Sequence, residues 1–223
     1  MLTVWSVYWG NKYHPAYVYE LQDAVSKNLT VEHEFKCITV EKLPGITTRN
    51  PPVSYSGWWQ KLGLFAPQVA TGPSIYFDLD VVITGNLDYL VPFTGYELAA
   101  PENWAQSGHG GIQSSVMCWR GNWTRPYEAF DYPKDSERLW GDQEFLWELL
   151  GDDWEKIPGV GSYKYHCRTN TSLPDWMKVA AFHGKPDPHE VTSGWMSRYT
   201  STLRNRINEI TEDGCKMVSS ATG

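Results

Sequence analysis

The chain has 223 residues, a formal charge of −7 and 41% apolar residues, which suits one domain with a sizeable core. The negative charge argues against a general nucleic-acid-binding protein, because that affinity comes mainly from cations that replace counterions along the phosphate backbone. The four cysteines form no Cys-x-x-Cys pair, and no segment has the roughly 20 apolar residues of a membrane span. We therefore expect a cytoplasmic protein with reduced thiols.

Aromatic residues make up 14% of the chain, with 12 Trp and 13 Tyr, more than a core of this size needs. We expect the surplus to line a groove, where a flat apolar face with a polar tip stacks on sugar rings or bases.

The first fifty residues predict a β-α-β opening. A strand is expected over residues 2–8, followed by a turn at 9–12. Pro15 begins a helix that ends near Asn28, because apolar residues recur between them at helical spacing. A second strand is expected over 34–40. Residues 44–52, which contain three prolines, are expected to form a loop.

The next segment carries the most informative pattern. A helix is predicted over 55–65, with Trp58, Leu62 and Phe65 on one face, and a buried strand from residue 74 then runs into Asp78 and Asp80. Because side chains alternate along a strand, both carboxylates are expected to point to one side. No Lys or Arg lies between residues 62 and 119, so a divalent cation or distant basic groups must neutralise the pair.

Paired carboxylates suit a hard cation such as Mg²⁺ or Mn²⁺, which is commonly completed by water and substrate phosphates. Taken alone, Asp-x-Asp is also common in solvated turns after strands.

Further strands are expected over 97–100, 112–119 and 178–182, with a helix over 141–150. The alternation predicts an α/β sheet with its site outside the carboxyl ends of the strands. Residues 1–213 are expected to form one domain and 214–223 a flexible tail.

Five motifs follow one another in an order more specific than any one of them. They are Trp-Trp-Gln-Lys-Leu (58–62), Tyr-Phe-Asp-Leu-Asp (76–80), Gln-Ser-Ser-Val-Met (113–117), Gly-Asp-Gln-Glu-Phe (141–145) and Phe-His-Gly-Lys-Pro (182–186). This order resembles a nucleotide-sugar glycosyltransferase of the GT-A fold, similar to the glycogenin and galactosyltransferase group and its small bacterial and phage relatives. The resemblance implies a Rossmann-like mixed sheet flanked by helices and, for a phage protein, a location in the host cytoplasm.

The resemblance also implies a metal-dependent hexosyl- or pentosyltransferase with a UDP-sugar donor. Mn²⁺ or Mg²⁺ would be held by Asp78, Asp80 and His183. Lys61 would lie near the donor sugar or phosphates, although a lysine that only covers Trp58 is the alternative.

Other residues take roles by the same likeness. Asp142 and Gln143 would face the sugar or acceptor, although an acid that complements the helix dipole explains Asp142 equally well. Gly184 and Lys185 would meet the diphosphate, and Asp78 would also contact the donor. Residues in and around the turn after the first strand would contact the nucleotide base, namely Tyr8, Gly10 and Tyr13. Two features depart from the family pattern: His183 and Lys185 are only two residues apart, and Gln113 stands where Asn is common.

Two other functions compete with sugar transfer. The segment 77–83 also resembles the nucleophile strand of haloacid-dehalogenase-like phosphohydrolases, with Asp152 and Asp153 as late acids, although about a third of the chain precedes it. A non-catalytic sugar- or nucleotide-binding module would explain the aromatic surplus alone. The acceptor is left open among a glycan, a protein, a small molecule and a modified DNA base.

Overall fold

The computed structural model describes residues 1–69, 71–104, 111–169, 172–192 and 194–220, the side chains of 212–220 excepted. Its main sheet has the order β3-β2-β1-β4-β7-β6-β8. The strands are β1 (Leu2–Val7), β2 (His33–Ile38), β3 (Thr47–Arg49), β4 (Ser74–Phe77), β6 (Ala99–Ala100), β7 (Val116–Trp119) and β8 (Glu155–Lys156). β1 pairs in parallel with β2 and β4, whereas β7 is antiparallel to β4 and β6. The predicted mixed α/β sheet is confirmed.

A second, three-stranded sheet positions the site. It comprises β5 (Val81–Ile83), β9 (Val160–Ser162) and β10 (Val179–Ala181), with β10 antiparallel to β5 and parallel to β9. Because β5 begins directly after Asp80 and β10 ends directly before Phe182, the antiparallel register sets these two ends side by side. The Phe182 N–H donates to the Asp80 carbonyl at 3.1 Å, so residues a hundred positions apart meet here.

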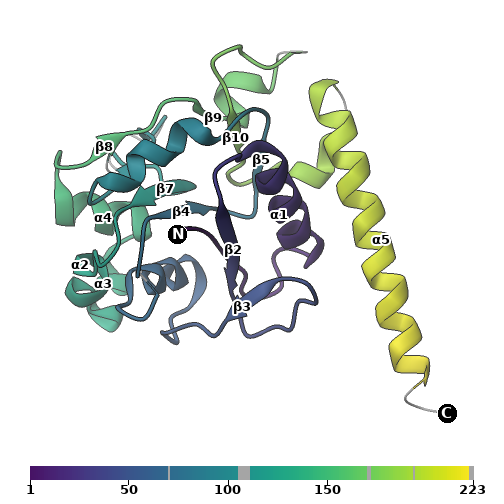
Figure 1. Cartoon of the computed structure of the whole chain (residues 1–223), viewed down its shortest axis with the longest axis horizontal. Coiled ribbons are helices and arrows are strands. Elements are labelled where there is room, and N and C mark those ends of the chain that lie inside the picture. The colour runs from purple at the N-terminus through teal and green to yellow at the C-terminus, as the bar shows by residue number, and fades with distance from the viewer. Residues whose placement is uncertain (70, 105–110, 170–171, 193, 221–223) are drawn as a thin grey trace.

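Helices cover both faces of the main sheet (Figure 1). The α-helices are α1 (Ala16–Asn28), α2 (Arg125–Ala129), α3 (Tyr132–Arg138), α4 (Asp142–Leu150) and α5 (Ser197–Ser220). Short 3₁₀ or π segments are η1 (Gly57–Phe65), η2 (Asp88–Gly95), η3 (Tyr163–Cys167), η4 (Pro188–Glu190) and η5 (Gly194–Met196). Figure 1 shows α5 beside α1, with its last turns extending past the rest of the molecule. Among the helices that the structure describes, none combines the length and the hydropathy that a membrane span requires.

The sheet is buried on both faces, as strands between two helical layers require. Val4 and Ile75 belong to the core cluster shared with α1, whereas their neighbours Trp5 and Tyr76 belong to the cluster shared with η1 and α4. The alternation therefore continues to the end of β4, so that Asp78 follows Tyr76 toward η1 and α4.

The helix predicted over 55–65 is a 3₁₀ helix, and the predicted apolar face was wrong by one residue. In a helix with three residues per turn, side chains three apart align, so Trp59, Leu62 and Phe65 share one buried row, and Lys61 and Leu64 are buried beside it. Trp58, which an α-helical period would bury, is 51% exposed.

Other differences concern short elements. The predicted loop over 44–52 contains β3, which extends the sheet edge by pairing with β2. The strands predicted over 97–100 and 112–119 are shorter at their starts, and Ile112 makes only an isolated bridge to Glu102. α5 continues to Ser220, where no regular structure was expected, and the flexibility of residues 214–223 stays a prediction. Cys37, Cys118 and Cys167 are free and buried, and the Cys215 side chain lies outside the described part.

Candidate active site

A cavity of about 470 Å³ opens beyond the carboxyl ends of β1, β4 and β10, where ligands bind in open α/β sheets. Its walls come from the turn after β1, from η1, from the β4–β5 turn, from the start of α4 and from the segment after β10. Eight of the predicted site residues line it: Tyr13, Lys61, Asp78, Asp80, Asp142, Gln143, His183 and Gly184.

Lys61 holds two carboxylates of this cavity. Its Nζ lies 2.9 Å from Asp78 Oδ1 and 3.6 Å from Asp142 Oδ2, and it donates to Ser114 Oγ at 3.1 Å. Burial alone would lower the pKa of Lys61, but the charges of Asp142 and Asp78 outweigh it and raise that pKa above the usual range. Lys61 is therefore a permanently charged group with its donors engaged, and the alternative of a lysine that merely covers Trp58 is wrong.

Asp78 is fixed from three sides. Besides Lys61, the Tyr76 hydroxyl donates to Asp78 Oδ1 at 2.5 Å, and the Asp78 N–H donates to the Ser115 carbonyl at 2.9 Å. Burial and the charge of Asp78 raise the pKa of Tyr76, so this phenol is a neutral donor at physiological pH. The sequence analysis missed Tyr76, although its place two residues before Asp78 on one strand face was a usable signal.

Asp80 is buried and weakly compensated. Among the described residues its carboxylate receives one hydrogen bond, from the Tyr13 hydroxyl at 2.7 Å. Burial and the charge of Asp78 raise the pKa of Asp80 to about 7, against the opposing effect of Tyr13. A second carboxylate charge is thus costly in the protein alone, and a divalent cation is the group that would relieve it. The donor set fits such an ion.

Asp142 is buried at the first turn of α4. Its Oδ2 atom makes no hydrogen bond with the described residues and lies only within ion-pair distance of Lys61. Burial raises the pKa of this carboxyl group, and the Lys61 charge opposes that rise. The preceding Gly141 allows close packing, because a Cβ there would lie 3.2 Å from Trp58 Nε1. Asp142 thus lies both in the first turn of α4 and in the cavity wall, and its contact with the sugar or acceptor stays a prediction.

His183 enters the cavity from the other sheet. Its Nε2 shares a 2.7 Å hydrogen bond with Ser162 Oγ, and its ring stacks near Trp104 and Tyr165. Burial and the charge of Lys164 lower the pKa of His183, so the imidazole is neutral, as a metal ligand must be. His183 and the two aspartates share one cavity, but their ligand atoms are not all within 4.8 Å of one another.

One cluster of the described residues does meet that distance, namely Asp187, His189 and Glu190. The sequence analysis did not single it out. Its acids are already compensated, because Lys185 Nζ lies 2.6 Å from Asp187 and 2.9 Å from Glu190. The His189 Nδ1 shares a 2.5 Å hydrogen bond with the Tyr17 hydroxyl. This cluster is a structural support beside the segment after β10.

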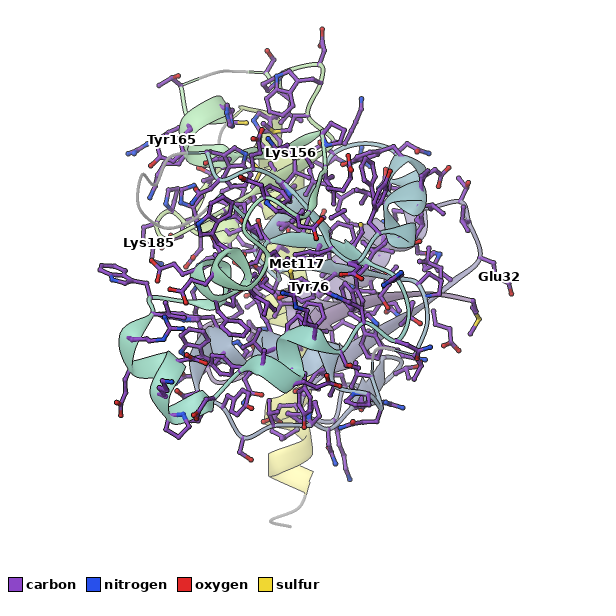
Figure 2. All side chains as sticks on the ribbon, turned by 90° about the vertical axis from the view of Figure 1, so that its left-hand side faces the viewer. Glu32, Tyr76, Met117, Lys156, Tyr165 and Lys185 are labelled. Carbon is purple, nitrogen blue, oxygen red and sulfur yellow. The ribbon has the colours of Figure 1, made fainter. Side chains whose placement is uncertain are left out.

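Three predicted residues do not line the cavity. Tyr8 is buried in the core on the α1 side, because Val7 at the end of β1 faces the cavity and the next side chain points the other way. Gly10 lies in the turn with a positive φ of 63°. The Lys185 side chain is 71% exposed and bound to its own acidic neighbours. Figure 2 shows Lys185 at the periphery and Tyr76 in the interior.

Among the other lining residues to which the sequence analysis gave no site role are two tryptophans and a lysine. Trp9 and Trp140 line the cavity together with Trp58, and Trp140 is 76% exposed. The lysine is Lys12, in the turn after β1. The aromatic surplus predicted a stacking groove in general, but it gave no means of choosing among twelve tryptophans. Asp152 and Asp153, which the phosphohydrolase alternative requires, are exposed and lie outside the lining.

The chain has the GT-A fold of nucleotide-sugar glycosyltransferases. No family model and no curated protein matches the sequence. An active-site mutant of LgtC superposes with a TM-score of 0.62 and 16% identity, over 92% of this chain and 96% of that one. The galactosyltransferase LgtC in complex with donor and acceptor sugar analogues gives a TM-score of 0.59 at 16% identity, with the same coverage of both chains.

A third similar structure is the glycosyltransferase GlyE of Streptococcus pneumoniae TIGR4, with a TM-score of 0.67 and 15% identity over 96% of this chain and 64% of that one. LgtC and GlyE are both glycosyltransferases, and at this identity the likeness shows the shared fold.

Proposed function

We propose that the protein is a metal-dependent glycosyltransferase that moves a hexosyl or pentosyl group from a UDP-sugar to an acceptor. One observation carries the proposal: the β5–β10 pairing sets His183 across one cavity from the buried, undercompensated Asp80. The fold shared with glycosyltransferases supports the same reading. We further propose that residues 1–213 form a single catalytic domain and that the enzyme acts in the cytoplasm, in the host cytoplasm if a phage encodes it.

In this proposal Asp78, Asp80 and His183 hold Mn²⁺ or Mg²⁺, which when bound offsets the charge that develops on a departing nucleoside diphosphate. Tyr13 holds the Asp80 carboxylate and stands at the base side of the donor. Gly184, whose φ is 67°, lets the backbone approach the diphosphate closely.

The remaining residues act on the sugar side. Lys61 is a positioning residue, because its ammonium fixes Asp78 and Asp142 rather than reaching for the donor. Asp142 and Gln143 line the wall where the transferred sugar would lie, and the Oδ2 atom of Asp142, which is buried and makes no hydrogen bond with the described residues, would accept one from a sugar hydroxyl that displaces its covering groups. No covalent step is required of the protein.

The first test is a thermal-shift screen of UDP, GDP, ADP and CDP with and without Mn²⁺. A ligand at 100 times its Kd stabilises the folded state by about 2.7 kcal/mol. For a chain of this length that amount corresponds to a rise in Tm of about 5–10 °C. We expect this rise for UDP with Mn²⁺ and its loss in excess chelator. An equal rise in chelator would contradict the metal role.

The tryptophans of the lining support a saccharide as the acceptor. Trp58 and Trp140 present large exposed faces at the cavity beside Asp142 and Gln143, an arrangement of apolar planes and polar groups that suits a pyranose ring. Substitution of exposed Trp140 by Ala is expected to raise the acceptor KM about tenfold through lost stacking, with an unchanged Kd for UDP. Transfer assays over an acceptor panel check this, and an unchanged KM for a saccharide acceptor would contradict it.

A further inference from the structure

The donor site lacks the late lysine that the sequence resemblance assigned to the phosphates. Lys185 lies outside the cavity and is held by Asp187 and Glu190. His183 and Gly184, whose φ is 67°, line the cavity, and the lining does not continue to Lys185. A diphosphate bound near Asp80 would therefore not meet Lys185.

Lys61 does not take the place of Lys185 as a phosphate-binding lysine. Its ammonium is within ion-pair distance of Asp78 and Asp142 and hydrogen-bonds Ser114, and its side chain is only 10% exposed. Withdrawing Lys61 toward a phosphate would leave the buried carboxylate of Asp142 and the partly buried one of Asp78 without their cation, which is energetically costly.

Lys12 is the remaining lysine of the described lining. It is exposed, and its Nζ lies 4.5 Å from the centroid of the Tyr13 ring, with no carboxylate of the described residues within ion-pair distance. The Tyr13 ring that Lys12 covers carries the hydroxyl that donates to Asp80, and Lys12 and Asp80 line the same cavity. A lysine on a flexible four-carbon stem carries a point charge that suits phosphate oxygens.

We propose that Lys12 binds the diphosphate of the nucleotide donor from the turn after β1, in the role that Lys185 cannot take. This inference rests on the proposed function, because it concerns the same donor. A divalent cation held by Asp78 and Asp80 would neutralise only part of the charge of a bound diphosphate. An ammonium that leaves the Tyr13 ring for the phosphate oxygens supplies a further positive charge without breaking an ion pair.

Two matched substitutions test the inference, Lys12→Met and Lys185→Met, with Lys12→Arg as the variant that keeps the charge. Both lysines are exposed, and each variant is first compared with the wild type by its Tm. Calorimetric titration with UDP in MnCl₂ is the main measurement, and competition by uridine reports the base alone. We expect Lys12→Met to weaken UDP binding about tenfold, the size of one lost charge-assisted contact, and to leave uridine unaffected. Lys185→Met is expected to bind UDP like the wild type, and Lys12→Arg to retain most of the affinity.

Three outcomes would overturn the inference while leaving the proposed function in place. They are unchanged UDP binding by Lys12→Met, a loss confined to Lys185→Met, and an equal weakening of uridine and UDP, which would assign Lys12 to the base. A wild type that binds none of the four nucleoside diphosphates would overturn the proposed function and this inference together.

Discussion

Asp80→Ala is expected to lower metal-dependent cleavage of the nucleotide-sugar donor at least about a hundredfold, because it removes a buried ligand from the charge-stabilising centre. The fold should persist without metal. Burial and Asp78 raise the pKa of Asp80 to about 7, so the ionised carboxylate is a cost to the metal-free protein and its removal relieves that cost. Release of UDP from the UDP-sugar, with the metal-free Tm beside it, measures both effects.

Asp153→Ala is the matched control, since Asp153 is an exposed aspartate outside the cavity. Sugar transfer predicts that this variant behaves like the wild type. Loss of turnover in Asp153→Ala, combined with phosphatase activity that beryllium fluoride inhibits, would favour the phosphohydrolase alternative. Full activity of Asp80→Ala would contradict the proposal that Asp78 and Asp80 hold a metal that the reaction requires.

Lys61→Met is expected to destabilise the fold by about 3–5 kcal/mol, because it leaves the carboxylates of Asp78 and Asp142 without their shared cation. Urea unfolding gives the free energy directly. The control is Lys185→Met, which breaks exposed ion pairs and should cost no more than about 1 kcal/mol.

A double variant separates the electrostatic cause from lost packing. If the uncompensated charge is responsible, Lys61→Met combined with Asp142→Asn should be more stable than Lys61→Met alone. A Lys61→Met variant as stable as the wild type would show that the two acids are compensated in another way.

The sequence predicted the α/β fold, and local rules and ordered motifs selected residues that lie together in the structure. Strand alternation predicted the face of Asp78, and His183, which the order of motifs singled out, lines the same cavity as Asp78 and Asp80. The sequence could not show why His183 arrives there, since the β5–β10 register is a contact between segments about a hundred residues apart.

Two sequence-based predictions were wrong for physical reasons that the spacing of apolar residues does not reveal. Trp58 and Trp59 exchange places because η1 adopts a three-residue period, and the sequence alone did not distinguish that period from an α-helical one. Lys185 was placed on the phosphates, whereas its ammonium is neutralised by Asp187 and Glu190, acids close by in sequence whose η4 turn holds them against it. Lys12 belongs to none of the five motifs, so only its position in the cavity lining makes it a candidate phosphate-binding residue.

The most direct test of the central claim is a titration with Mn²⁺ in the presence of UDP, followed by electron paramagnetic resonance. The cation should be shared by carboxylates and one imidazole. One Mn²⁺ should bind per chain, with a nitrogen coupling from histidine that disappears in His183→Gln and much weaker binding in Asp80→Asn. Tight binding of one Mn²⁺ with an unchanged nitrogen signal in His183→Gln would contradict the account, as would binding that persists in Asp80→Asn and is lost on substitution of His189.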